Sequence, residues 1–81
     1  MITDYINAAL ATAVFEQLED GSHYGEIRAL PGVWADGKSL EECRHTLQEV
    51  LEDWLVLALK AGDAVPEIGG IDINRVGQGV G

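Results

Sequence analysis

The sequence predicts one small domain of the α+β class. Three short segments rich in β-forming residues lie in the first half of the chain, and turn signals separate them. A single long segment with the apolar period of an α-helix follows at residues 40–61. The chain has 81 residues, of which 47% are hydrophobic, so it can build one modest core. We therefore expect a single domain over residues 1–81, an antiparallel sheet with the long helix on one face.

A short helix is expected at residues 3–13, ahead of the first strand. Thr3 can cap its amino end, and Asp4 suits the partial positive charge found there. Ile6 and Leu10 lie one turn apart and predict an apolar face. This helix is therefore expected to pack on the rest of the domain.

A three-strand meander is expected over residues 12–36. Asp20-Gly21 and Pro31-Gly32 are turn signals that divide this stretch into three runs. Gly25 lies inside the second run, where it indicates a bulge or a close approach to the backbone. The three strands are expected at residues 12–19, 23–30 and 33–36.

The helix at residues 40–61 has the strongest signal in the sequence. Ser39 and Glu42 have the spacing of a capping box, and Gly62 is a natural stop. Apolar residues recur at steps of three and four and form one stripe. They are Leu40, Cys43, Leu47, Val50, Leu51, Trp54, Ala58 and Ala61.

A last strand is expected at residues 71–76, where Ile71 and Ile73 alternate with polar residues. It would complete a β-β-β-α-β layer behind the N-terminal helix. The long helix covers one face of the sheet, so the other face must be covered by something else or be polar.

The charge balance favours a basic protein as partner. The chain has 5 Lys and Arg against 14 Asp and Glu, a net charge of −9. Phosphate repels such a chain, so direct DNA binding is not expected. The longest run without charge, Tyr5–Phe15, is too short to span a membrane. A single cysteine, Cys43, and the lack of a visible export signal predict a cytoplasmic protein.

No catalytic, metal or cofactor motif is recognisable, so we expect no enzyme and no cofactor. His23 and His45 have no partner at metal-ligand spacing, and His45 is expected to pair with Glu41 or Glu49 on the helix surface. Cys43 is expected to be a small buried residue rather than a reactive thiol.

The end of the long helix is apolar on all sides. Trp54, Val56 and Leu59 are expected to form an oligomer interface, because the apolar stripe does not need them. Their cover could be the N-terminal helix, a second subunit or a partner. Trp34, like Trp54, is expected in the core or in a subunit interface.

A pattern of turns and caps runs from His23 to Trp54. Its parts are Tyr24-Gly25-Glu26-Ile27, Leu30-Pro31-Gly32-Val33-Trp34-Ala35-Asp36-Gly37, Ser39-Leu40-Glu41-Glu42-Cys43, Glu49 and Trp54. This order of strand, Leu-Pro-Gly turn, short strand and capped helix resembles the HicB antitoxins.

The resemblance implies a partial ribonuclease-H-like β-β-β-α-β fold and a dimeric or larger assembly. It also implies a partner, the small basic mRNA-cleaving toxin HicA. The extra N-terminal helix and Cys43, where alanine is usual, depart from the family pattern. The 15 residues after Pro66 lack a helical period and a basic cluster, so the family's usual DNA-binding segment is not expected.

Three functions follow from these observations. The first is a HicB-like antitoxin that binds a basic toxin through one acidic helix face. The residues expected in that face are Glu42, Glu49, Asp53, Glu41 and Glu52. The second is a stand-alone oligomeric module that binds a protein or small ligand, and the third is a small metal-dependent nuclease. The third is disfavoured because these carboxylates face solvent and do not converge on a metal.

Overall fold

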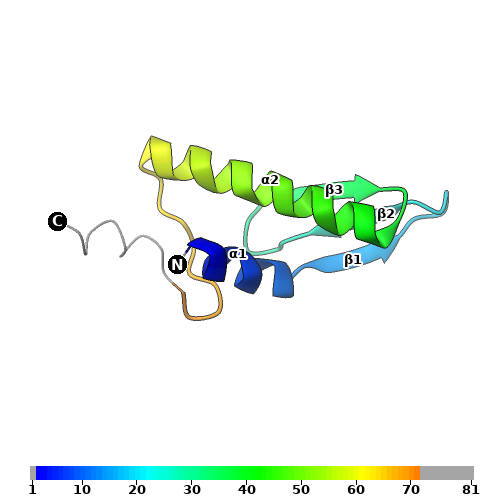
Figure 1. Cartoon of the computed structure of the whole chain (residues 1–81), viewed down its shortest axis with the longest axis horizontal. Helices are drawn as coiled ribbons and strands as arrows, with labels where there is room; N and C mark the ends of the chain where they lie inside the picture. The colour runs from blue at the N-terminus through cyan, green and yellow to red at the C-terminus, as the bar shows by residue number, and fades with distance from the viewer. Residues whose placement is uncertain (1, 72–81) are drawn as a thin grey trace.

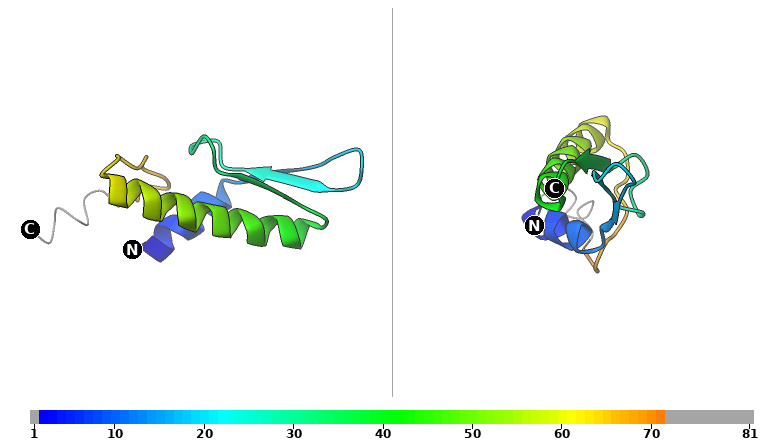
Figure 2. Two further views of the ribbon diagram at one scale, coloured as in Figure 1. Left: turned by 90° about the horizontal axis from the view of Figure 1, so that it is seen from above. Right: turned by 90° about the vertical axis from the view of Figure 1, so that its right-hand side faces the viewer.

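The computed structural model describes residues 2–71, and it has the predicted α+β class (Figure 1). Its elements follow the expected order of helix, three strands and helix. They are α1 (Ile2–Ala11), β1 (Val14–Gln17), β2 (His23–Glu26), β3 (Trp34–Gly37) and α2 (Leu40–Ala61). The two helices form one layer and the three-strand sheet forms the other (Figure 2).

The sheet is an antiparallel meander with the strand order β1-β2-β3. Phe15, Gly25 and Ala35 lie opposite one another across the three strands, on the face toward α2. A Cβ atom on Gly25 would lie 2.6 Å from the Phe15 ring, so only glycine leaves room for that ring. The predicted close approach at Gly25 is therefore confirmed, and the unbroken register shows no bulge.

The second strand ends earlier than predicted, at Glu26 instead of Leu30. The Ile27 amide donates to the Val33 carbonyl oxygen (3.1 Å), and the Val33 amide donates to that of Leu30 (3.0 Å). These apolar residues therefore form a buried turn rather than a longer strand. Gly32 has a φ of +94°, which allows the chain to reverse there.

Helix α2 has the predicted bounds. The Ser39 hydroxyl oxygen accepts the Glu42 amide at 3.1 Å, and Gly62 ends the helix in the left-handed region. Its buried stripe is Cys43, Leu47, Leu51, Leu55 and Ala58. The prediction that Leu40 and Ala61 belong to this stripe is wrong, because Leu40 is 45% exposed and Ala61 is exposed as well. The first turn instead meets the sheet through its backbone, since a Cβ on Gly37 would lie 2.7 Å from the Cys43 nitrogen.

Helix α1 runs over residues 2–11 rather than 3–13, and Thr12 closes its end by bonding to the Ala9 carbonyl oxygen. It lies mainly beside the C-terminal half of α2 (Figures 1 and 2). The Tyr5 hydroxyl donates to the Pro66 carbonyl oxygen at 2.6 Å and joins α1 to the segment after α2. That segment adds Val65 and Ile68 to the core.

Of the last strand expected at residues 71–76, only Ile71 lies within the described residues. It pairs with Ile68 in a single antiparallel bridge, closed by hydrogen bonds of 2.9 and 3.2 Å. Within residues 2–71 the sheet therefore has three strands.

Candidate protein-interaction surfaces

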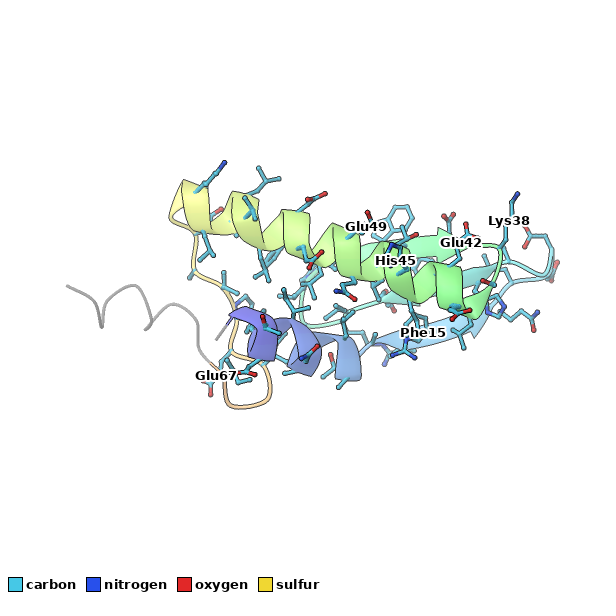
Figure 3. All side chains as sticks on the ribbon, in the orientation of Figure 1. Phe15, Lys38, Glu42, His45, Glu49 and Glu67 are labelled. Carbon is cyan, nitrogen blue, oxygen red and sulfur yellow. The ribbon has the colours of Figure 1, made fainter. Side chains whose placement is uncertain are left out.

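The carboxylates of α2 point away from the sheet. Because the buried stripe of the helix faces the core, the opposite side is left to solvent. All five residues predicted for the partner-binding face are exposed, namely Glu41, Glu42, Glu49, Glu52 and Asp53. We call these five residues the acidic face of α2. Figure 3 shows Glu42, His45 and Glu49 following one another along the helix.

His45 lies among these acids and pairs with one of them. Its Nε2 atom is 3.4 Å from Glu49 Oε1, one turn further along α2, as the sequence predicts. Both side chains are well exposed, so this pair contributes little stability and leaves the face open to a partner. Within residues 2–71, no three His, Cys, Asp or Glu side chains come close enough together to hold a metal ion.

The acidic face continues into exposed apolar side chains at the end of α2. Val56 is 51% exposed, Leu57 is 68% exposed and Leu59 is 41% exposed. We call these three residues the apolar end of α2. Helix α1 leaves Val56 and Leu59 exposed, so the N-terminal helix is not what covers them. A second subunit and a partner remain.

The described part of the chain has no helix that is both long and apolar enough to cross a membrane.

Leu57 and Trp54 also lie near this end of the helix. Leu57 was not singled out from the sequence, although it belongs to the same all-round apolar run. Trp54, expected on the apolar stripe as well as in the interface, is half-buried and packs against the core, as the stripe predicts. The apolar end of α2 therefore includes Val56 and Leu59, two of the three predicted interface residues. It also includes Leu57, which was not predicted.

The outer side of the sheet forms a second surface that the sequence did not predict. Trp34 lies there and is 53% exposed, so of the two places expected for it, the core and a subunit interface, the core is excluded. It is in β3 next to Ala35, and the alternation of a strand turns Ala35 inward and Trp34 outward. Trp34 stacks on Tyr24 with ring centroids 6.0 Å apart.

Cys43 is not a reactive site. Its side chain is fully buried, and its Sγ atom lies 3.6 Å from the Ala35 carbonyl oxygen. Burial, and to a smaller extent the charge of Asp36, raise the pKa of the Cys43 thiol. A thiol that stays protonated is a poor nucleophile, so Cys43 serves as the small buried residue that its place in the helix predicts.

Comparison with known proteins places this fold in a family. No curated protein matches the sequence. The crystal structure of TTHA0281 from Thermus thermophilus is similar, with 48% sequence identity and a TM-score of 0.84. The match covers 89% of this chain and 90% of that one. The family model described as UPF0150-like matches residues 4–66, from α1 to the segment after α2. This chain therefore belongs to the UPF0150-like family.

Proposed function

We propose that this chain is a HicB-like, antitoxin-type protein that binds and neutralises a small basic mRNA-cleaving toxin of HicA type. The observation that carries the proposal is the outer side of α2, where the acidic face adjoins the apolar end. The resemblance of residues 23–54 to the HicB pattern points to the same partner. The role is that of a binding protein rather than an enzyme, and the single buried cysteine suits a reducing cytoplasm.

The two parts of this surface have different tasks in binding. The acidic face and the net charge of −9 attract a cationic partner and speed its approach, so the association rate should fall as salt rises. Exposed charges at the rim of an interface contribute little affinity singly. The apolar end of α2 should therefore hold the complex together once water has left the contact. Inhibition then needs only that the bound chain covers the toxin's active site.

Charge reversal on α2 tests the proposal. Glu49→Lys combined with Asp53→Lys should slow association with the toxin at least about tenfold, because it reverses two of the five charges of the acidic face. Leu57→Ser should instead speed dissociation, since it removes apolar contact. The matched control is Asp63→Lys with Glu67→Lys, which changes the net charge equally at exposed acids outside α2. Rates can be measured by surface plasmon resonance at several salt concentrations.

The partner is sought by co-expression with a small basic protein, if the neighbouring reading frame encodes one. A toxic neighbour, growth rescued by this chain and a co-purifying complex support the antitoxin function. The antitoxin function is wrong if the neighbour is harmless or if the two proteins elute apart at low salt. An effect of the control pair equal to that of Glu49→Lys with Asp53→Lys would remove the acidic face from the proposal.

A stand-alone oligomeric module is the second candidate, favoured by the apolar end of α2. Val56, Leu57 and Leu59 would then meet a second copy of the chain instead of a toxin, and the acids would keep the assembly soluble. The small nuclease has the least support, because the carboxylates of α2 spread along an outer helix face and do not converge.

A further inference from the structure

The outer side of the sheet alternates apolar and acidic side chains. Residues directly opposite one another across antiparallel strands point to the same face. One row across the sheet is Val14, Glu26 and Trp34, and the next is Glu16, Tyr24 and Asp36. These rows flank the inward row that meets α2, so all six side chains point outward. We call these six residues the outer sheet face.

No described helix or loop covers the outer sheet face. Both helices lie on the other side of the sheet (Figure 2). Trp34 and Val14 are exposed, and Tyr24 is half-buried with its ring stacked on Trp34 at an interplanar angle of 29°. Trp34 keeps about half of its exposure after folding, so an apolar ring surface is left for a contact with another molecule.

Carboxylates surround the aromatic pair. Tyr24 has Glu16 on one side and Asp36 on the other as its cross-strand neighbours. Its hydroxyl also lies 3.3 Å from Glu26 Oε2 and donates to it. Partial burial, then the negative charges of Glu26 and Glu16, raise the pKa of Tyr24. The electrostatic environment of the rings is therefore negative.

One cation of the chain already lies at the margin of this surface. The Arg28 Nε atom is 3.7 Å from Glu26 Oε1, and the Arg28 side chain is 75% exposed. Three carboxylates and one guanidinium leave the surface with a formal charge of −3 + 1, or −2. The remaining carboxylates, Glu16 and Asp36, are exposed and therefore open to a further cation.

We propose that the outer sheet face binds an arginine-bearing segment of a protein partner, with a guanidinium on the exposed face of Trp34. A planar guanidinium stacks on an indole ring and forms hydrogen bonds with carboxylates in the same plane. Trp34 supplies the ring, and Asp36, two residues further along the same face of β3, supplies the acceptor. Lysine has a compact charge without a flat face, so arginine fits this arrangement better.

The charges decide against a second copy of this chain as the occupant. A two-fold contact through this face would bring Glu16, Glu26 and Asp36 against the same three residues of the copy, and such like charges repel. The chain also lacks a cationic segment to offer, because its five basic residues are scattered. They are Arg28, Lys38, Arg44, Lys60 and Arg75. Nucleic acid is disfavoured because its phosphates meet the same negative surface.

This inference does not depend on the antitoxin function. The outer sheet face and the acidic face of α2 lie on opposite layers of the fold, so each can be tested while the other is intact (Figures 1 and 2). Failure of the toxin test leaves the sheet surface open to another basic protein, and failure of the sheet test leaves α2 unaffected.

The test is an NMR titration of the full chain with a short peptide of alternating arginine and glycine. We expect the largest shifts at the Trp34 indole and at the amides of β2 and β3, and weaker binding of the matched lysine peptide. Trp34→Leu keeps an apolar side chain but removes the aromatic face, so it should weaken arginine binding by roughly fivefold and remove the preference over lysine. Trp34→Phe should keep part of the arginine binding and part of the preference over lysine. Leu40→Ser, at an exposed apolar residue of α2 outside both proposed surfaces, is the control and should bind normally.

Three results would overturn the proposal. One is shifts that centre on the acidic face of α2, which would show that the peptide follows net charge alone. Another is that the natural chain binds the arginine and lysine peptides equally, or that Trp34→Leu binds the arginine peptide as tightly as the natural chain does. The third is a concentration-dependent shift of the Trp34 indole without peptide, because it would identify a second copy as the occupant. Circular dichroism of each variant confirms that its fold is intact.

Discussion

At the centre of the sheet, Gly25 leaves the space that the Phe15 ring fills. A methyl group there would lie 2.6 Å from a ring carbon of Phe15 and 3.3 Å from the Cys43 sulfur. Gly25→Ala should therefore lower the free energy of unfolding by about 1–3 kcal/mol, the usual cost of overpacking. Urea denaturation followed by circular dichroism measures this change.

The second variant needed is Phe15→Leu, alone and combined with Gly25→Ala. Leucine lacks the ring atoms that clash, so the alanine should cost less in the leucine background than in the natural chain. A double-mutant cycle isolates that difference. Equal costs in both backgrounds would show that the clash with Phe15 is not what requires glycine.

The buried thiol of Cys43 should make the free energy of unfolding depend on pH. Because burial raises its pKa in the folded chain, the thiol keeps its proton at a pH where the unfolded chain has lost it. The unfolded state then binds fewer protons, so stability falls as pH rises above about 8.5, the usual pKa of cysteine. Cys43→Ala should make the profile of unfolding free energy against pH flatter from about pH 8 to 9.5, below most tyrosine ionisation. Parallel profiles for the two proteins would contradict this origin.

Among the elements, α2 depends on its cap at Ser39. The Ser39 hydroxyl oxygen accepts the Glu42 amide, which the first helical turn would otherwise leave without a partner. Ser39→Ala should cost about 1 kcal/mol of stability, and Ser39→Asp should cost much less because aspartate also caps helices. Thermal denaturation of the three proteins compares them. A loss in Ser39→Asp as large as in Ser39→Ala would mean that the position matters for another reason.

Local signals made α2 predictable and the strands less so. Ser39 and Gly62 fix the ends of the helix by side-chain and backbone chemistry that can be read from the sequence. The end of β2 has no such marker, since Ile27 continues the alternation that puts Gly25 on the inner face but is buried in a turn. Leu40 fits the helical period and is still exposed, because the period does not tell how far the sheet extends along the helix.

Of the two candidate surfaces, one could be predicted from the sequence and the other could not. The acidic face of α2 follows from the helical period, which places its carboxylates opposite the buried stripe. The outer sheet face depends on the pairing of strands only four residues long. Register decides that Tyr24 meets Glu16 and Asp36 across the sheet, and register is a tertiary property that a single strand does not encode.

For the molecule as a whole, the apolar end of α2 predicts self-association in the absence of a partner. A core this small benefits from further burial, and Val56 and Leu59 are available for it. Val56→Glu and Leu59→Glu should each shift the protein toward the monomer in light scattering after gel filtration. Leu40→Glu, an exposed apolar residue at the opposite end of the helix, is the control and should leave the assembly unchanged. A monomeric natural chain at micromolar concentrations would rule out this association.

The hydrogen bond from Tyr5 to Pro66 has a consequence for synthesis of the chain. The two residues are 61 positions apart, so Tyr5 has no acceptor there until nearly all of the described chain has been made. The meander and the start of α2 can pair while translation continues, because their contacts are local. Helix α1 can pack on α2 once that helix is complete, but its contacts with Val65 and Ile68 have to wait until those residues have left the ribosome. Helix α1 is therefore the first helix to emerge but among the last elements to complete its packing. A translational pause before residue 65 would leave part of its apolar side exposed for longest.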